Sequence, residues 1–94
     1  MTGLAKSVEV TVRSNRIRVD FLKLDVQLGL TFSGMALKTQ DSEKRARTRR
    51  LGRKAYDTVL RLMDRVALTK EDDQSLALNL YRLKCDLVML GEIF

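Results

Sequence analysis

The chain has 94 residues and a formal net charge of +6, from 18 Lys and Arg against 12 Asp and Glu. It contains one Cys and no His. A single cysteine excludes an internal disulfide framework, and the absence of histidine excludes Ser-His-Asp catalysis and histidine-ligated metals. The length fits one small domain over residues 1–94, with residues 1–13 as a candidate irregular or strand-like arm.

The chain carries no recognisable targeting signal. No run of about 18 apolar residues predicts a transmembrane helix. The N-terminal segment MTGLAKSVEV lacks the apolar core of a signal peptide. An unpaired Cys85 suits a reducing compartment. We therefore expect a cytoplasmic protein that does not enter a membrane.

The first predicted helix spans about residues 16–38. One helical face carries apolar residues at spacings of three and four, which predicts the core-facing stripe. The members of that stripe are Ile17, Phe21, Leu24, Leu28, Phe32 and Met35. An alternative stays open, because apolar and polar residues alternate over 8–21 and Ser14-Asn15 could form a hairpin turn. That alternative is an α+β fold with an N-terminal β-hairpin. We favour the helix because no turn signal lies between Asp20 and Thr39, and we leave 4–13 unassigned.

The second predicted helix spans about residues 42–67 and begins at Asp41 or Ser42. Its predicted core stripe is Leu51, Ala55, Val59, Leu62 and Val66.

The third predicted helix spans about residues 70–91. Thr69 precedes three acidic residues, which is typical of an N-cap followed by the favourable end of the helix dipole. Leucines then recur over four turns, and Gly91 is a suitable stop. The leucine stripe is Leu76, Leu80, Leu83, Leu87 and Leu90. Three helices with short connections predict an all-α fold, either an antiparallel three-helix bundle or a helical-hairpin-like unit.

The first and third helices each carry a second apolar face, which a single small bundle does not need. We interpret these faces as a surface for self-association, because exposed contiguous apolar patches mark interfaces and symmetric dimers are the commonest assembly. In the first helix Gly29, Ser33 and Ala36 also form a small-residue groove that another helix could approach closely. The predicted interface residues are Val19, Leu22, Val26, Gly29, Leu30, Ser33, Leu37, Leu78, Tyr81, Cys85, Val88, Met89, Ile93 and Phe94.

The positive charge is concentrated in residues 44–54, where seven of eleven residues are Lys or Arg and none is acidic. The remainder of the chain is nearly neutral. A basic helical face can follow nucleic-acid phosphates, or it can bind an acidic protein, or it can simply be solvated. The candidate anion-binding residues are Lys44, Arg45, Arg49, Arg50, Arg53, Lys54 and Arg61.

No arrangement of side chains indicates an active site, a metal site, a cofactor or a small-molecule substrate. Cys85 lies on an apolar face, and we expect it to be a buried structural thiol. The sequence therefore predicts a non-catalytic module for protein interaction or assembly, with a homodimer expected and another protein as a second partner. The alternative is a nucleic-acid-binding accessory protein that uses the basic segment.

Two segments carry a resemblance to a known family. Leu28-Gly29-Leu30-Thr31-Phe32 resembles part of the first helix of a tetratricopeptide-type repeat, and residues 54–60, Lys-Ala-Tyr-Asp-Thr-Val-Leu, resemble part of its second helix. The resemblance covers about half the chain, but the spacing between the two parts is too long and the terminal proline is missing. It implies a helical hairpin for protein interaction without catalysis.

Overall fold

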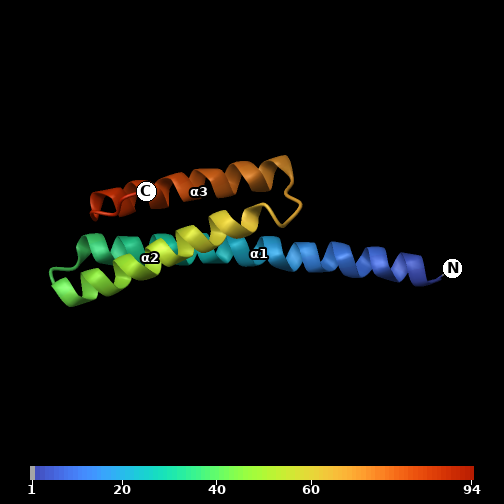
Figure 1. Ribbon diagram of the computed structural model, residues 1–94, viewed down its shortest axis with the longest axis horizontal. Coiled ribbons are helices and arrows are strands. Elements are labelled where there is room, and N and C mark those ends of the chain that lie inside the picture. The colour runs from blue at the N-terminus through green and yellow to red at the C-terminus, as the bar shows by residue number, and fades with distance from the viewer. Residues whose placement is uncertain (1) are drawn as a thin grey trace.

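The computed structural model describes the backbone of residues 2–94 and the side chains of residues 12–94. It contains three helices, α1 (Thr2–Lys38), α2 (Ser42–Met63) and α3 (Lys70–Met89), joined by short connections. Successive helices run antiparallel, and both α2 and α3 pack against α1 (Figure 1). Over residues 2–94 there is no strand. The fold is the predicted all-α antiparallel three-helix bundle.

The first helix is longer than predicted. It begins at Thr2, so it includes residues that we left unassigned and extends past the ends of α2 and α3 (Figure 1). The alternative β-hairpin over 8–21 and the separate arm expected over 1–13 are therefore wrong from Thr2 onward, and Met1 lies outside the described residues. The molecule measures 62 × 22 × 18 Å as a result.

Asn15 shows why Ser14-Asn15 is not a hairpin turn. It lies within α1, and its side-chain amide donates to the Ala67 carbonyl at 2.9 Å while its oxygen accepts from the Ala67 N–H at 2.8 Å. Asn15 thus satisfies both backbone groups of Ala67 in the connection between α2 and α3. α2 ends at Met63, before the predicted residue 67, and Ala67 lies in the connection to α3.

Three other helix ends are capped, and two of them, at Thr69 and Gly91, are the predicted cap and stop of α3. Asp41 caps α2 by accepting from the N–H groups of Glu43 and Lys44, and Thr69 caps α3 by accepting from the Asp72 N–H. At the other end of α3, Gly91 adopts a φ of 98°. The Gly91 N–H donates to the Val88 carbonyl and the Glu92 N–H to the Leu87 carbonyl, which completes a Schellman motif and turns the chain back toward α2.

The core is built from the second apolar face of α1, the leucine stripe of α3, and Tyr56 and Val59 of α2. Leu22, Val26 and Ser33 of α1 are fully buried, as are Leu83 and Leu87 of α3. The leucine stripe of α3 is confirmed, since four of its members are buried and Leu90 is half-buried.

The buried face of α2 is smaller in side-chain volume than predicted. Ala55 and Val59 are buried as expected, but Leu51 is exposed and Leu62 and Val66 are only half-buried. The remaining buried positions of this helix are Thr48, Gly52 and Tyr56.

Small residues let α1 and α2 pack with their backbones close together. A Cβ atom placed on Gly52 would lie 3.5 Å from the Gly29 carbonyl oxygen, and one on Gly29 would lie 3.0 Å from the Ala55 Cβ. The small-residue groove predicted in the first helix therefore receives a helix, and that helix is α2 of the same chain.

Candidate interaction surfaces

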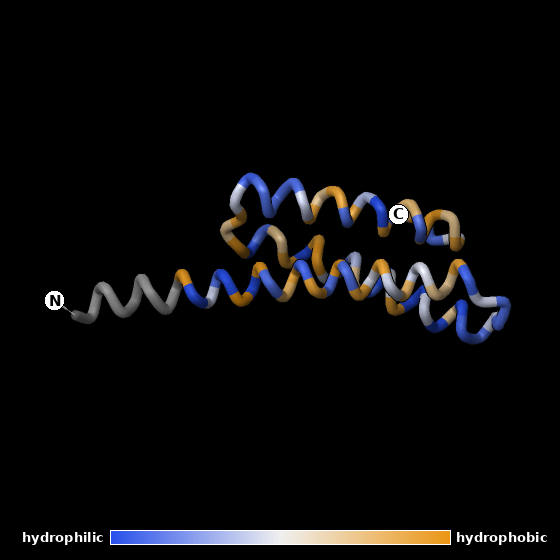
Figure 2. The backbone as a smooth tube through the Cα atoms, turned by 180° about the vertical axis from the view of Figure 1, so that it is seen from behind, coloured by the Kyte–Doolittle hydropathy of each residue, from blue (hydrophilic) through white to orange (hydrophobic). Residues whose placement is uncertain are grey.

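The face of α1 that we predicted as its core is exposed. Leu24 is 71% exposed and Ile17 64%, and Phe21, Leu28 and Met35 are also exposed. We call these five residues the α1 stripe. Phe32, which was predicted with them, is half-buried. Apolar residues recur along α1 from residue 12 onward (Figure 2), and the stripe, with Val12 and Leu37, accounts for the large ones that are exposed.

Conversely, the α1 residues predicted to meet a partner are mostly internal. Val19, Leu22, Val26, Gly29 and Ser33 are buried within the chain, so their assignment to an interface was wrong. Leu30 is half-buried and packs against the core. The physical reason is the close approach of α2, which only the small-residue face allows. Leu37 alone of this group is exposed.

Ser33 of this face makes its hydrogen bonds within the same chain. Its hydroxyl donates to Asp86 of α3 at 2.8 Å and also lies 3.1 Å from the Leu30 carbonyl. A fully buried hydroxyl needs such partners, because an unpaired one is costly. Ser33 therefore ties α1 to α3 within one molecule.

A shallow groove adjoins the N-terminal half of the α1 stripe. Ile17, Phe21 and Leu22 of α1 line one side, Leu62 and Val66 the other, and the volume is about 370 Å³. Two arginines, Arg18 and Arg65, also line the groove. The stripe is thus continuous with apolar surface from the end of α2.

The outer face of α3 is a second apolar surface. All the predicted interface residues on it are exposed, which leaves their interface role a prediction. These residues are Leu78, Tyr81, Cys85, Val88 and Met89. Our expectation that Cys85 is a buried thiol was wrong, because the core face of α3 lies on the opposite side of the helix.

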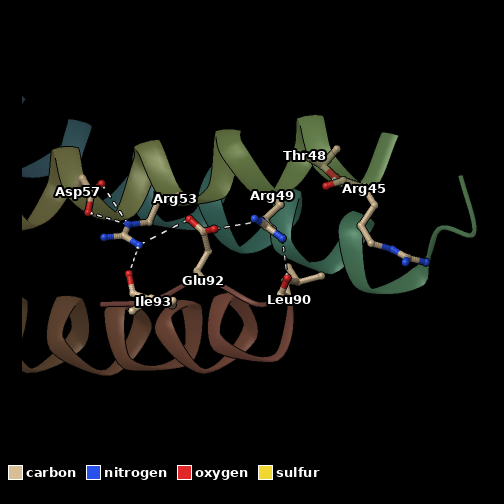
Figure 3. Close-up of polar contacts among 8 residues, drawn as sticks. All are labelled: Arg45, Thr48, Arg49, Arg53, Asp57, Leu90, Glu92 and Ile93. Carbon is tan, nitrogen blue, oxygen red and sulfur yellow. Dashed lines mark hydrogen bonds and ion pairs between the residues drawn. The ribbon is translucent and has the colours of Figure 1, made fainter. Parts of the chain in front are cut away.

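Two arginines of the basic segment bind the C-terminal tail. Arg49 pairs with Glu92 at 3.0 Å and donates to the Leu90 carbonyl (Figure 3). Arg53 donates to the Ile93 carbonyl and lies 3.5 Å from the Glu92 carboxylate. Arg53 also pairs with Asp57 at 3.1 Å. Arg49 and Arg53, which we predicted as anion-binding residues, therefore hold the end of the chain against α2.

The last residue completes this arrangement. The Arg53 guanidinium lies 4.1 Å from the centre of the Phe94 ring, and the Tyr56 ring meets Phe94 edge-on with centroids 5.0 Å apart. Phe94 is thus held by its own chain, whereas the neighbouring Ile93 side chain is 88% exposed. We call Arg49, Arg53, Glu92 and Phe94 the C-terminal clasp.

The rest of the basic segment faces solvent. Arg45 donates to the Thr39 carbonyl at 2.7 Å and so serves the connection between α1 and α2. Arg50, Lys54 and Arg61 are exposed and take part in none of the ion pairs found over residues 12–94. Lys44 is half-buried at the first turn of α2. The cationic surface of α2 is therefore smaller than the sequence indicated.

Two carboxyl groups have shifted pKa values. Partial burial raises the pKa of Asp25, and the nearby Lys54 charge opposes this effect. The pKa of Asp72 is lowered, first by its hydrogen bond with Lys23 and then by its hydrogen bond with Thr69. The Lys23–Asp72 pair is 2.6 Å long and joins α1 to the start of α3.

Several of these functional residues were not identified from the sequence. The contacts of Asn15, Glu92 and Asp86 join residues more than 35 positions apart, and only the fold brings such residues together. The α1 stripe was identified as a unit, but its side of the helix was misassigned.

Within the described residues, no helix holds an apolar stretch long enough to span a bilayer. No family model, curated protein or solved structure matches the chain. The resemblance to a tetratricopeptide-type repeat therefore remains a hypothesis.

Proposed function

We propose that the chain is a non-catalytic assembly module that self-associates through the α1 stripe. The observation that carries this proposal is the exposure of Ile17, Phe21, Leu24 and Leu28 on one side of α1, opposite the buried face. Large apolar side chains that are exposed singly are ordinary on protein surfaces, but a contiguous row of them is typical of an interface.

The charge pattern supports the same proposal. Arg18, Asp20 and Asp25 flank the stripe, so a polar rim surrounds an apolar centre, as in protein interfaces generally.

Light scattering or sedimentation over roughly 1 to 500 μM tests this proposal. This concentration range includes the dissociation constants of dimers of modest affinity. We expect a mass that rises with concentration toward twice the 10.8 kDa of the chain. Leu24→Glu places a charge at the most exposed position of the stripe and should keep the protein monomeric over the whole range. Because Leu24 is exposed, this substitution should change the free energy of unfolding of the monomer by only about 0.5 kcal/mol.

Leu78→Glu on the outer face of α3 is the matched control. Leu78 is 51% exposed, and the same change of chemistry there should leave the mass profile unaltered. If Leu78→Glu dissociates the assembly and Leu24→Glu does not, the α3 face is the interface. A wild-type chain that remains monomeric at the highest concentration would contradict self-association altogether.

A second candidate function is binding of nucleic acid by the solvated cations of α2. It is favoured by the exposure of Arg50, Lys54 and Arg61, which take part in no ion pair among the described residues. These three residues line a shallow depression together with Arg53, Thr58 and the acidic Asp57 and Glu92.

Phosphate binding through such a face would weaken steeply with salt. Fluorescence anisotropy with a duplex and a single-stranded probe at low salt tests it. We expect measurable binding that decreases with added salt and is lost in a combined Arg50→Ala, Lys54→Ala and Arg61→Ala variant. Equal binding by this variant and the wild type would exclude the face as the binding site.

A further inference from the structure

We infer that two copies of the chain pack their α1 stripes antiparallel, with Ile17 against the partner's Leu28 and Phe21 against the partner's Leu24. This inference rests on the proposed self-association and specifies the geometry of that contact. It commits the stripe to one occupant, a second copy of the same chain.

The spacing of the stripe defines the kind of surface that covers it. Ile17, Phe21, Leu24 and Leu28 are separated by four, three and four residues, and Thr31 and Met35 continue the pattern. This is the alternation of d and a positions in a heptad, whose side chains pack into the holes of a facing helix with the same repeat. A second α1 stripe has that repeat, and a twofold axis would bring the two together.

The charges beside the stripe decide the direction of the partner helix. Arg18 and Asp25 border the stripe on the α2 side. Arg18 lines the groove together with Leu62 of α2, and the charge of Lys54 of α2 acts on the Asp25 carboxylate. On the other side, Asp20 lines a depression with Thr69 and Asp72 at the start of α3. Arg13 stands seven residues before Asp20 and therefore shares that side of the helix.

In a parallel pair, opposite flanks meet. Arg13 would face the partner's Arg18, and Asp20 would face the partner's Asp25, and both contacts are repulsive. In an antiparallel pair, equivalent flanks meet, so Arg18 can face the partner's Asp25 twice across the twofold axis. Neither side chain has an ion-pair partner among the described residues. The antiparallel direction is therefore the one that satisfies the charges.

The same charges select one register. The inferred register buries the four large apolar residues against one another and places the half-buried Ser14 beside the partner's Thr31. Sliding the partner by one heptad in one direction sets Arg18 against the partner's Arg18. Sliding it in the other direction sets Asp25 against the partner's Asp25.

The area is consistent with a weak but specific dimer. Given the exposed fractions along the stripe, each copy would contribute roughly 500 Å², and the pair would reach the ~1,000 Å² expected of a biological contact. An area at this lower limit predicts a concentration-dependent dimer, for which sedimentation is a suitable measurement.

Charge reversal tests the inference. Arg18→Glu alone and Asp25→Arg alone should each raise the dimer dissociation constant about 5- to 30-fold at low salt, because each creates two symmetric repulsions. An equimolar mixture of the two variants should dimerise like the wild type, since opposite charges then meet at both positions. Arg82→Glu, an exposed change on α3 outside the ion pairs of the described residues, should leave the dissociation constant unaltered.

Disulfide trapping gives an independent readout. In a Cys85→Ser background, Ile17→Cys and Leu28→Cys chains should form a disulfide only when mixed. In the inferred register like positions lie roughly 16 Å apart along the axis, at 1.5 Å per residue, which is too far for a disulfide. Rapid cross-linking of Leu28→Cys with itself would show a parallel pair.

The outcomes separate the two proposals. If the wild type dimerises and neither charge reversal changes the dissociation constant, the antiparallel register is wrong and self-association still holds. A wild-type chain that stays monomeric overturns both.

Discussion

At the residue scale, two glycines of α1 have opposite surroundings. Gly29 is buried where α1 crosses α2, and a Cβ added to it would lie 2.7 Å from Leu83 Cδ2 and 3.0 Å from Ala55 Cβ. Gly34 has no atom within 4 Å of that position. Glycine is therefore required for close packing at Gly29, whereas the surroundings of Gly34 leave room for a side chain.

We expect Gly29→Ala to destabilise the fold by about 1–3 kcal/mol. Leu83 is fully buried and has little room to move, so the added methyl overpacks the crossing. Gly34→Ala is the matched control and should raise the free energy of unfolding by up to ~1 kcal/mol, because alanine favours a helix interior. Urea denaturation at low protein concentration measures both. Stabilisation by both substitutions would mean that α1 and α2 are not in close contact at Gly29.

A second residue-scale prediction concerns pH and the Lys23–Asp72 pair. The pKa of Asp72 is lowered in the folded state, so its charged form stabilises the fold above the unfolded pKa of about 3.9. That stabilisation is lost as the pH falls through the folded pKa. We expect wild type to have a higher Tm than Asp72→Asn between about pH 5 and 8, and the two curves to converge below about pH 4. A difference that is constant down to about pH 2 would show that the pair does not contribute through charge.

At the element scale, the capped ends of the helices were predictable, whereas the start of α1 and the end of α2 were not. Asp41, Thr69 and Gly91 were identified because capping depends on a few neighbouring residues and needs no tertiary contact. The buried face of α1 was misassigned because hydropathy favours the stripe with the larger side chains. The helix crossing instead requires small residues, and a single sequence does not tell which of two apolar faces meets a neighbour.

The C-terminal clasp gives the element-scale prediction. Phe94→Ala removes the Arg53 and Tyr56 contacts of the ring, and we expect it to destabilise the packing of the tail on α2 by about 1 kcal/mol. Amide exchange of residues 91–93 should become faster. Ile93→Ala is the control and should have little effect, because that side chain is exposed. Equal exchange rates in the two variants would contradict a role of the Phe94 ring in the clasp.

At the scale of the whole molecule, composition and periodicity were enough to predict three helices and their antiparallel order. They were not enough to show which charges are used internally. Arg49 and Arg53 look like the rest of a basic run until Glu92 is placed beside them by the Schellman turn at Gly91. The N-terminal extension of α1 was missed because alternating valines also fit a strand, and tertiary structure decides between such patterns.

The α1 stripe finally predicts how the stability of the molecule depends on its concentration. A ligand that binds only the folded state raises Tm, and here the ligand is a second folded copy. Above the dissociation constant, a tenfold increase in protein concentration raises the free energy of unfolding by about 0.7 kcal/mol per chain. This is half of the ~1.4 kcal/mol that corresponds to a factor of ten, because two chains share it. For a chain of this length that corresponds to a rise in Tm of about 3–5 °C. Calorimetry at a series of concentrations measures it, and Leu24→Glu should abolish the dependence whereas Leu78→Glu should preserve it. A wild-type Tm that does not change with concentration would mean that the stripe stays exposed in solution.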